Sequence, residues 1–177
     1  MKHRTYFINW LAGLALFLTS TAALAEERKG SGAAVPATNS ISQAADGTIK
    51  LHAKEAVIHG TTVRYEPQPH KNTIGYWTKA EDWVSWDFTL SQPGAFTVEM
   101  TQACGQGSGG SEYLLSIAGQ AIKDTVPETG AFTNFVHRVI GTVKLPQAGR
   151  YTLAVKPVRK PGLAVMDLRA VTLRPVQ

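Results

Sequence analysis

Residues with catalytic or ligand-binding chemistry are thinly spread along this chain of 177 residues. The stretch 105–110 satisfies the GxGxxG pattern of dinucleotide sites, which needs a strand before it and a helix after it to receive the pyrophosphate. Another strand-like segment follows instead, so we interpret this stretch as a flexible connection. Neither Ser108 nor Ser111 lies in a GxSxG nucleophile elbow, because Gln106 and Tyr113 stand where that motif needs glycine.

Metal-site and acid–base patterns are equally weak. Four histidines follow residue 25, and they lack the spacing of HExxH or of a Cys/His metal site. They are His52, His59, His70 and His137. The 13 acidic residues could form many carboxylate pairs for glycoside hydrolysis, and a sequence does not show their separation in space. Cys104 is expected to be a small packed side chain. The sequence therefore predicts no enzyme, no catalytic residue, no metal and no cofactor, with a small hydrolase as the weaker alternative.

Aromatic residues beside turns offer a better candidate site. Tyr76 and Trp77 follow Gly75 after a polar loop, and Phe132 follows the turn-forming residues 129–131. A sugar has weakly polar C–H faces and a rim of hydroxyl groups, so its site needs flat rings for stacking and a few fixed polar groups. These rings could instead close the hydrophobic core, and for Trp77 the two interpretations carry equal weight.

Strand patterns dominate the part of the chain that must position these residues. Along Trp83–Leu90 apolar residues alternate with polar ones, and the same period of two recurs around Phe96–Gln102. The linking residues 91–94 contain a Pro-Gly pair that favours a tight turn, so the two segments are predicted to form a hairpin.

Further strands are predicted at regular intervals, and no apolar run of helical period is long enough for a crossover helix. The sheets should therefore be mainly antiparallel, and the predicted fold is an all-β sandwich or barrel. The additional strands are expected at Thr48–Lys54, Tyr113–Ile117, Val136–Val143, Arg150–Lys156 and Ala164–Arg174.

The N-terminus has the pattern of a signal peptide over residues 1–25. Lys2 and Arg4 precede an apolar stretch, and Ala23-Leu24-Ala25 supplies the small residues that a signal peptidase recognises. An uncleaved membrane anchor is the alternative, but the apolar stretch is shorter than the ~20 residues of a spanning helix. We expect an exported, periplasmic or extracellular protein without stable membrane insertion after cleavage. Residues 26–46 are predicted to be a flexible linker and residues 47–177 the sandwich domain.

The charge balance argues against nucleic acid as a partner. The chain carries 18 Lys and Arg against 13 Asp and Glu, and loss of Lys2 and Arg4 with the signal peptide lowers the net charge from +5 to +3. No basic cluster with interleaved aromatic residues is present, as a nucleic-acid site would need. The mild positive charge permits an acidic polysaccharide ligand.

Several segments, in order, resemble family 6 carbohydrate-binding modules. The longest is NTIGYWTKAEDWVSWDFTLSQPGAFTVEM (72–100), in which a Gly-Tyr pair leads to an Asp-Trp-Val strand and a turn. LHAKEAVIHG (51–60) precedes it, and ETGAFTNF (128–135) and AVMDLRAVTLRP (164–175) follow it. The match covers about residues 49–175, essentially the whole predicted domain. This resemblance implies an all-β, jelly-roll β-sandwich of the galactose-binding-like type, without catalytic residues, such as those attached to secreted glycoside hydrolases and sulfatases.

The resemblance also implies site residues. In the family's main cleft two aromatic residues clamp a sugar ring and an Asn bonds its hydroxyl groups; the matching positions hold Tyr76, Phe132 in place of Trp, and Asp167 in place of Asn. Phe132 has less stacking area than Trp and lacks the indole N–H, and an ionised Asp167 does not donate hydrogen bonds. Positions of the family's structural calcium ligands hold Lys54 and Arg169, so no calcium is expected there.

Two hypotheses follow for function. The first is an exported, non-catalytic glycan-binding module with a shallow aromatic site near Tyr76, Phe132 and Asp167, with the neighbouring Trp77 and Asn134 as further candidates. The second is a structural module with a protein partner, which kept the sandwich and lost sugar binding. The replaced residues at the cleft and at the calcium positions agree with the second hypothesis as well.

Overall fold

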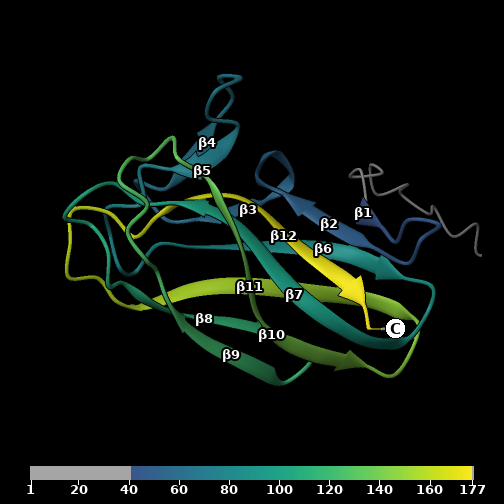
Figure 1. Cartoon of the computed structure of the whole chain (residues 1–177). Coiled ribbons are helices and arrows are strands. Elements are labelled where there is room, and N and C mark those ends of the chain that lie inside the picture. Colours follow the sequence, from purple (N-terminus) through teal and green to yellow (C-terminus); the bar gives the residue numbers. More distant parts are fainter. Residues whose placement is uncertain (1–40, 177) are drawn as a thin grey trace, which may run out of the picture. The chain divides into compact units, whose positions relative to one another are not determined.

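The computed structural model describes residues 41–176 (Figure 1). The predicted signal peptide and residues 26–40 of the predicted linker lie outside the described residues. Two six-stranded sheets make up the described part, and a short 3-10 helix, η1 (Ala53–Glu55), follows the second strand. Among residues 41–176 no helix has the length and apolar character needed to cross a membrane.

The first sheet, which we call the β6 sheet, combines the first described strand with strands from the middle and later parts of the chain. Its order is β1 (Ile41–Ser42), β6 (Trp83–Leu90), β11 (Gly149–Arg159), β8 (Glu112–Ile117) and β9 (Gln120–Thr125), with β3 (Val57–His59) also paired to β6. The β1–β6 pair is parallel, and the other strand pairs described in this sheet are antiparallel.

The second sheet, called the β7 sheet, is antiparallel throughout its described pairs. Its order is β10 (Val136–Leu145), β7 (Gly94–Ala103), β12 (Asp167–Pro175), β5 (Thr73–Gly75) and β4 (Arg64–Glu66), with β2 (Ile49–His52) also paired to β12. The two sheets confirm the predicted all-β, mainly antiparallel sandwich.

Alternate residues of the long strands form the core between the sheets. Trp86, Phe88 and Leu90 of β6 are at most 1% exposed, as are Phe96 and Val98 of β7. Side chains point to opposite faces along a strand, so a period of two places every second residue in the interior. Each large apolar side chain buried in this way contributes about 1.5–3 kcal/mol relative to exposure.

The predicted hairpin between residues 83–90 and 96–102 is wrong. β6 pairs with β11 and β7 pairs with β10 and β12, so residues 91–93 carry the chain from one sheet to the other. Since β6 and β7 present their apolar faces to each other across the core, they cannot also be neighbours in one sheet. A Pro-Gly turn specifies a reversal of direction, and both arrangements need such a reversal.

The ordered unit begins before the predicted boundary at Gly47. Ile41 and Ser42 pair with Phe88 and Thr89, and the Gln43 side chain then holds the turn that follows β6. Its amide oxygen accepts from the backbone N–H groups of Ser91 (3.1 Å) and Gln92 (2.7 Å). Residues 41–46 are therefore part of the sandwich rather than of the predicted linker.

Besides β1, four strands have no counterpart among the predicted segments: β3, β4, β5 and β9. β3, β4 and β5 have three residues each, too few to show a period of two. β9 alternates in exposure, but Ile122 is its only large apolar residue in the sequence QAIKDT. Short strands are specified by their partners more than by their own residues.

The stretch 105–110 connects β7 to β8 without a helix, in agreement with its interpretation as a connection. It is not free, however, because the Gly107 N–H donates to Glu128 Oε1 (2.6 Å) and Ser108 is buried. Cys104, at its start, is fully buried as predicted. Burial raises the pKa of its thiol to about 11, with smaller contributions from the charges of Glu128 and Asp167, so it stays protonated and unreactive.

Candidate functional site

Tyr76 stands immediately after β5 and points outward. Its φ of +52° lies in the left-handed region, a rare and strained conformation for a residue with a side chain. Tyr76 is 51% exposed, and the Arg64 guanidinium carbon lies 3.5 Å from the centroid of the Tyr76 ring. Gly75 before it has no room for a Cβ, because the Glu66 carboxylate occupies that space. The Gly-Tyr pair therefore places a ring and a carboxylate side by side.

Phe132 is carried by the loop between β9 and β10. Its ring packs on Gly105, where a Cβ would lie 2.5 Å from the ring, and Gly130 in the same loop forms a bridge with Gly105. The Thr129 hydroxyl accepts from the Cys104 N–H (2.9 Å) and further anchors the loop. The first glycine of the GxGxxG stretch thus serves to position an aromatic side chain.

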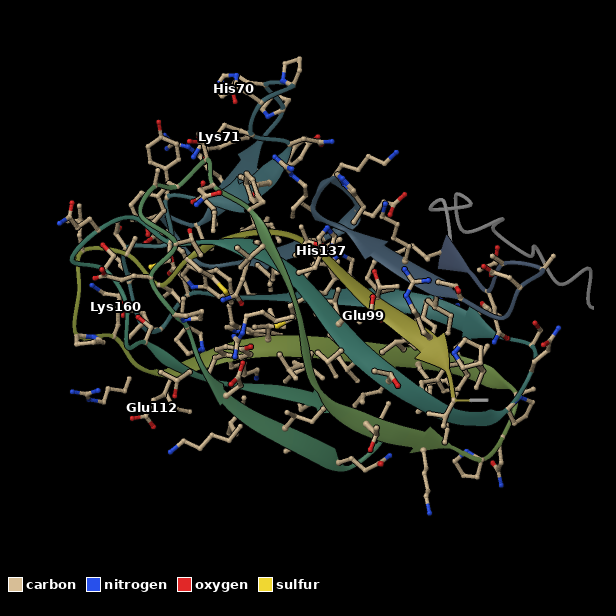
Figure 2. The ribbon with its side chains drawn as sticks, in the orientation of Figure 1. His70, Lys71, Glu99, Glu112, His137 and Lys160 are labelled. Carbon is tan, nitrogen blue, oxygen red and sulfur yellow. The ribbon has the colours of Figure 1, made fainter. Side chains whose placement is uncertain are left out.

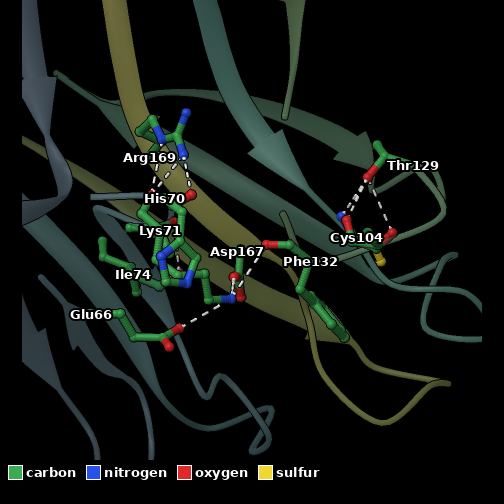
Figure 3. A network of polar contacts seen from close by, with 11 residues as sticks. Glu66, His70, Lys71, Ile74, Cys104, Thr129, Phe132, Asp167 and Arg169 are labelled. Atoms are coloured by element: carbon green, nitrogen blue, oxygen red, sulfur yellow. Dashed lines mark hydrogen bonds and ion pairs between the residues drawn. The ribbon is translucent and has the colours of Figure 1, made fainter. Parts of the chain in front are cut away.

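Asp167, the first residue of β12, is only 3% exposed and is held by Lys71 (Figure 3). The Lys71 ammonium donates to Asp167 Oδ2 and to the Phe132 carbonyl oxygen (3.3 Å), and lies 3.5 Å from Glu66 Oε1. Burial raises the pKa of Asp167 to about 6; Lys71 opposes this shift and the Glu66 charge adds to it. Burial lowers the pKa of Lys71, but Asp167 and Glu66 outweigh it and raise the pKa overall.

One pocket of about 330 Å³ brings together three of the five predicted site residues: Tyr76, Phe132 and Asp167. We call it the aromatic pocket. The sequence analysis did not select its other lining residues, which are Glu66, Lys71, Thr78, Leu163 and Ala164. Glu66, at the end of β4, and Lys71, in the loop after it, are opposite charges before Tyr76, and Leu163 and Ala164 follow a Pro-Gly pair. Those are weak signals, because charged loops are common.

The two remaining predicted residues do not line this pocket. Trp77 is fully buried, and its indole N–H donates to the Asp82 carbonyl oxygen (2.8 Å), so the core interpretation is the correct one. The reversed backbone at Tyr76 turns one ring outward and the next inward. Asn134 donates from Nδ2 to the Thr129 carbonyl oxygen (2.5 Å) and braces the loop that carries Phe132.

The two positions that the resemblance to family 6 carbohydrate-binding modules aligns with calcium ligands hold the cations Lys54 and Arg169. Lys54 is exposed and lies 3.9 Å from a Glu55 oxygen. The Arg169 guanidinium donates to the carbonyl oxygens of His70 (3.0 Å) and Lys71 (2.8 and 3.0 Å). Neither a guanidinium that already donates to carbonyl oxygens nor an exposed ammonium can serve as a calcium ligand, so these residues do not fit a calcium site. Within residues 41–176 no group of three or more His, Cys, Asp or Glu side chains could hold a metal ion.

Solved structures similar to this chain include isolated carbohydrate-binding modules, carbohydrate-active enzymes and the insecticidal crystal protein Cry2Aa. The family 35 carbohydrate-binding module from Clostridium thermocellum is 14% identical, with a TM-score of 0.59 over 73% of this chain and 98% of that one. The module CBM6cm-2 of Cellvibrio mixtus lichenase 5A, solved with cellotriose, is 18% identical, with a TM-score of 0.55 over 72% and 97%.

A third similar structure is the GH26-CBM35 β-(1,4)-mannanase of Podospora anserina, at 17% identity and a TM-score of 0.57. The match covers 75% of this chain and 28% of the mannanase. At these identities the similarity establishes the fold. Among curated proteins no sequence matches this chain.

A sequence profile matches residues 58–176, which include all the lining residues of the aromatic pocket. The profile is that of the family described as "Domain of unknown function (DUF5077)". Because the match covers most of the chain and nearly all of the sandwich, the protein belongs to the DUF5077 family.

Proposed function

We propose that this protein is an exported, non-catalytic glycan-binding module and that the aromatic pocket binds a sugar residue. The observation that carries the proposal is the joint placement of Tyr76 and Phe132 on one pocket with a polar floor. Its volume, about 330 Å³, lies in the range of small-molecule sites. The strained backbone at Tyr76 agrees with a functional role, since such strain clusters at ligand sites.

The polar floor would orient the sugar by hydrogen bonds. Glu66 and Asp167 contribute carboxylate oxygens and Lys71 holds them at fixed positions, while Thr78 adds a hydroxyl group. Carboxylates accept hydrogen bonds from sugar hydroxyl groups, and charge-assisted bonds are the stronger kind. The floor therefore favours a ligand rich in hydroxyl donors.

The fold supports the proposal. One of the similar modules was solved with cellotriose, another is a family 35 carbohydrate-binding module, and a third similar structure is a β-(1,4)-mannanase. Export, to the periplasm or beyond, is part of the proposal and rests on the N-terminal sequence pattern.

A non-catalytic role agrees with the arrangement of the two carboxylates in the pocket. Glu66 and Asp167 are a pair of the kind that glycoside hydrolysis uses, but the same ammonium group lies against both. A hydrolase needs one of the pair free to protonate the leaving oxygen. Here the more buried carboxyl, Asp167, is engaged by Lys71.

Loss of sugar binding, with a role in protein interaction, is the second candidate. Two observations favour it: Arg64 already covers one face of the Tyr76 ring, and Lys71 already occupies Asp167. A sugar would have to use the opposite face of the ring or displace the guanidinium.

Binding to a glycan array of neutral, uronate-containing and sulfated oligosaccharides, followed by titration calorimetry, tests the proposal. We expect Tyr76→Ala with Phe132→Ala to weaken the best ligand more than about tenfold, since each ring contributes stacking and buried area. Tyr76→Phe should keep most of the affinity. Val158→Ala, an exposed apolar change on β11, is the matched surface control.

Each outcome separates the candidates. Unchanged affinity in the double variant, with its circular dichroism spectrum and melting temperature intact, would reject the aromatic pocket as the site. Absence of any glycan ligand would favour the interaction module. Release of shorter oligosaccharides from the bound glycan would reject the non-catalytic role.

A further inference from the structure

The outer face of the β7 sheet carries a second hollow, of about 210 Å³, separate from the aromatic pocket. Strand register explains its shape, because His52, Ala170, Thr101 and His137 are successive partners across β2, β12, β7 and β10. The small side chains of Ala170 and Thr101 leave space between the two histidines. We call this hollow the histidine trough; it is lined by Lys50, His52, Thr101, His137, Arg169 and Ala170.

The histidine trough is cationic and contains no acidic lining residue. Within residues 41–176, neither Lys50 nor Arg169 has a carboxylate at ion-pair distance. The nearby carboxylates have other partners. Glu55 lies against Lys54, and Glu99, which lies over the same sheet as His137 in Figure 2, pairs with Arg174 (2.9 Å).

Arg169 is held in one orientation before any ligand arrives. Its Nε and Nη2 groups donate to the carbonyl oxygens of His70 and Lys71 (Figure 3). Its guanidinium carbon lies 3.5 Å from the centroid of the Phe135 ring. Among the described residues Nη1 has no acceptor. A fixed guanidinium with free N–H groups is well suited to an oxyanion, because little entropy is lost on binding.

His52 adds a directed donor. Its Nδ1 accepts from the Lys54 N–H (3.2 Å), so the neutral ring carries its proton on Nε2. Burial lowers the pKa of His52; the Glu55 charge opposes this shift, and the charges of Lys50, Lys54 and Arg169 add to it. The ring is therefore neutral at pH 7 and adds no charge to that of Lys50 and Arg169.

His137 bounds the trough on the opposite side. Its Nδ1 lies 3.0 Å from the Thr101 hydroxyl oxygen, which fixes the plane of the ring. The histidine trough thus has an oriented imidazole at each end, and the Arg169 guanidinium and the Lys50 ammonium group also line it.

We propose that the histidine trough binds an oxyanion group of the sulfate or phosphate type through Arg169, His52 and Lys50. The site does not depend on the proposed sugar pocket. The histidine trough and the aromatic pocket are neighbours, however, because Lys71 contacts a residue of each. Its carbonyl oxygen accepts from Arg169, and its ammonium group donates to Asp167. A polymer that carries anionic substituents could therefore contact both sites.

The first experiment is an NMR titration of the purified protein with sodium sulfate, at constant ionic strength with chloride as the counter-titrant. We expect saturable shifts of the ring C–H signals of His52 and His137, and a higher pKa of His52 when sulfate is bound, since a nearby anion favours the charged imidazole. Lys50→Gln should weaken sulfate binding roughly threefold or more, as it removes one charge-assisted contact.

The matched control is Arg150→Gln, which removes the same charge from an exposed position on β11 in the other sheet. Its affinity for sulfate should equal that of the unchanged protein. The Tyr76→Ala, Phe132→Ala protein should also bind sulfate normally, so failure of the sugar pocket and failure of the trough are distinguishable.

The source of the anion is decided by parallel titrations with inorganic phosphate, dextran sulfate and uncharged dextran. Binding of dextran sulfate more tightly than free sulfate, with no binding of dextran, would assign the site to a polymer-borne group. Binding of the free ions with no gain from the polymer would assign it to a small anion. The proposal is overturned if neither histidine signal shifts, or if Arg150→Gln weakens binding as much as Lys50→Gln.

Discussion

Lys71 determines how the aromatic pocket is charged. Its ammonium group lies against two carboxylates, and without it the nearly buried Asp167 would have to keep an unpaired charge or take up a proton. Removal of one partner from a buried ion pair is more harmful than removal of both, because the desolvated charge remains. Lys71 is thus a structural residue of the pocket before it is a binding residue.

We expect Lys71→Met to lower the free energy of unfolding by about 2–3 kcal/mol at pH 7, and by less at pH 5. At pH 5 Asp167, whose pKa is raised to about 6 by burial, is largely protonated, so the lost ion pair matters less. Urea unfolding at the two pH values measures the difference. Lys144→Met, at an exposed position, is the control, and an equal cost at both pH values would contradict the argument.

At the scale of elements, one carboxylate organises the segment between β3 and β4. Asp82 accepts from the backbone N–H groups of Thr61 (3.1 Å), Thr62 (2.8 Å) and Val63 (2.9 Å), and from the Thr62 hydroxyl (2.8 Å). Burial raises the pKa of Asp82, but these four hydrogen bonds outweigh it and lower the pKa to about 2. The same residue accepts from the Trp77 indole through its carbonyl oxygen, so it also fixes the chain beside Tyr76.

Asp82→Ala should therefore cost about 3 kcal/mol of unfolding free energy, since it leaves three backbone N–H groups, including that of the buried Val63, without this acceptor. Chemical denaturation followed by Trp fluorescence measures the loss. Glu81→Ala, the exposed acidic neighbour in the sequence, should change stability by less than about 0.5 kcal/mol. Equal effects of the two substitutions would show that the hydrogen bonds of Asp82 are unimportant.

At the scale of the whole molecule, two buried carboxyls give stability opposite dependences on pH. The folded pKa of Asp82 lies below its ordinary value of 3.8, so its contribution is complete above about pH 4 and is lost as the pH falls toward 2. The folded pKa of Asp167 lies above 3.8, so the folded state retains a proton that the unfolded state releases, and its contribution grows as the pH falls from about 6 to 4.

We expect Asp82→Asn to reduce the loss of stability between pH 4 and pH 2, a loss worth about 2 kcal/mol in the unchanged protein from this group. Asp167→Asn should instead flatten the profile between pH 6 and pH 4.5. Thermal melts from pH 2 to pH 8 measure both profiles. Unchanged slopes in these variants would show that other carboxyls control the acid limb.

Much of the fold was readable from the sequence, because strand periodicity is local. The alternation along residues 83–90 and 96–102 predicted two strands with buried faces, and β6 and β7 include both. The partners of those strands were not readable, since a period of two is the same in a hairpin and across a sandwich. The anchoring role of Gln43 was missed for the same reason, as its contacts lie 48 and 49 residues away.

The sequence by itself determined the all-β class and, through its family resemblance, the selection of Tyr76, Phe132 and Asp167. Only the tertiary structure decided that these three line one pocket, that Trp77 faces the core, and that Lys71, 96 residues from Asp167 along the chain, neutralises it. The histidine trough likewise exists only through the register of four strands. Periodicity and turn chemistry act between near neighbours, whereas ion pairs and pockets form between segments that only the pairing of strands brings together.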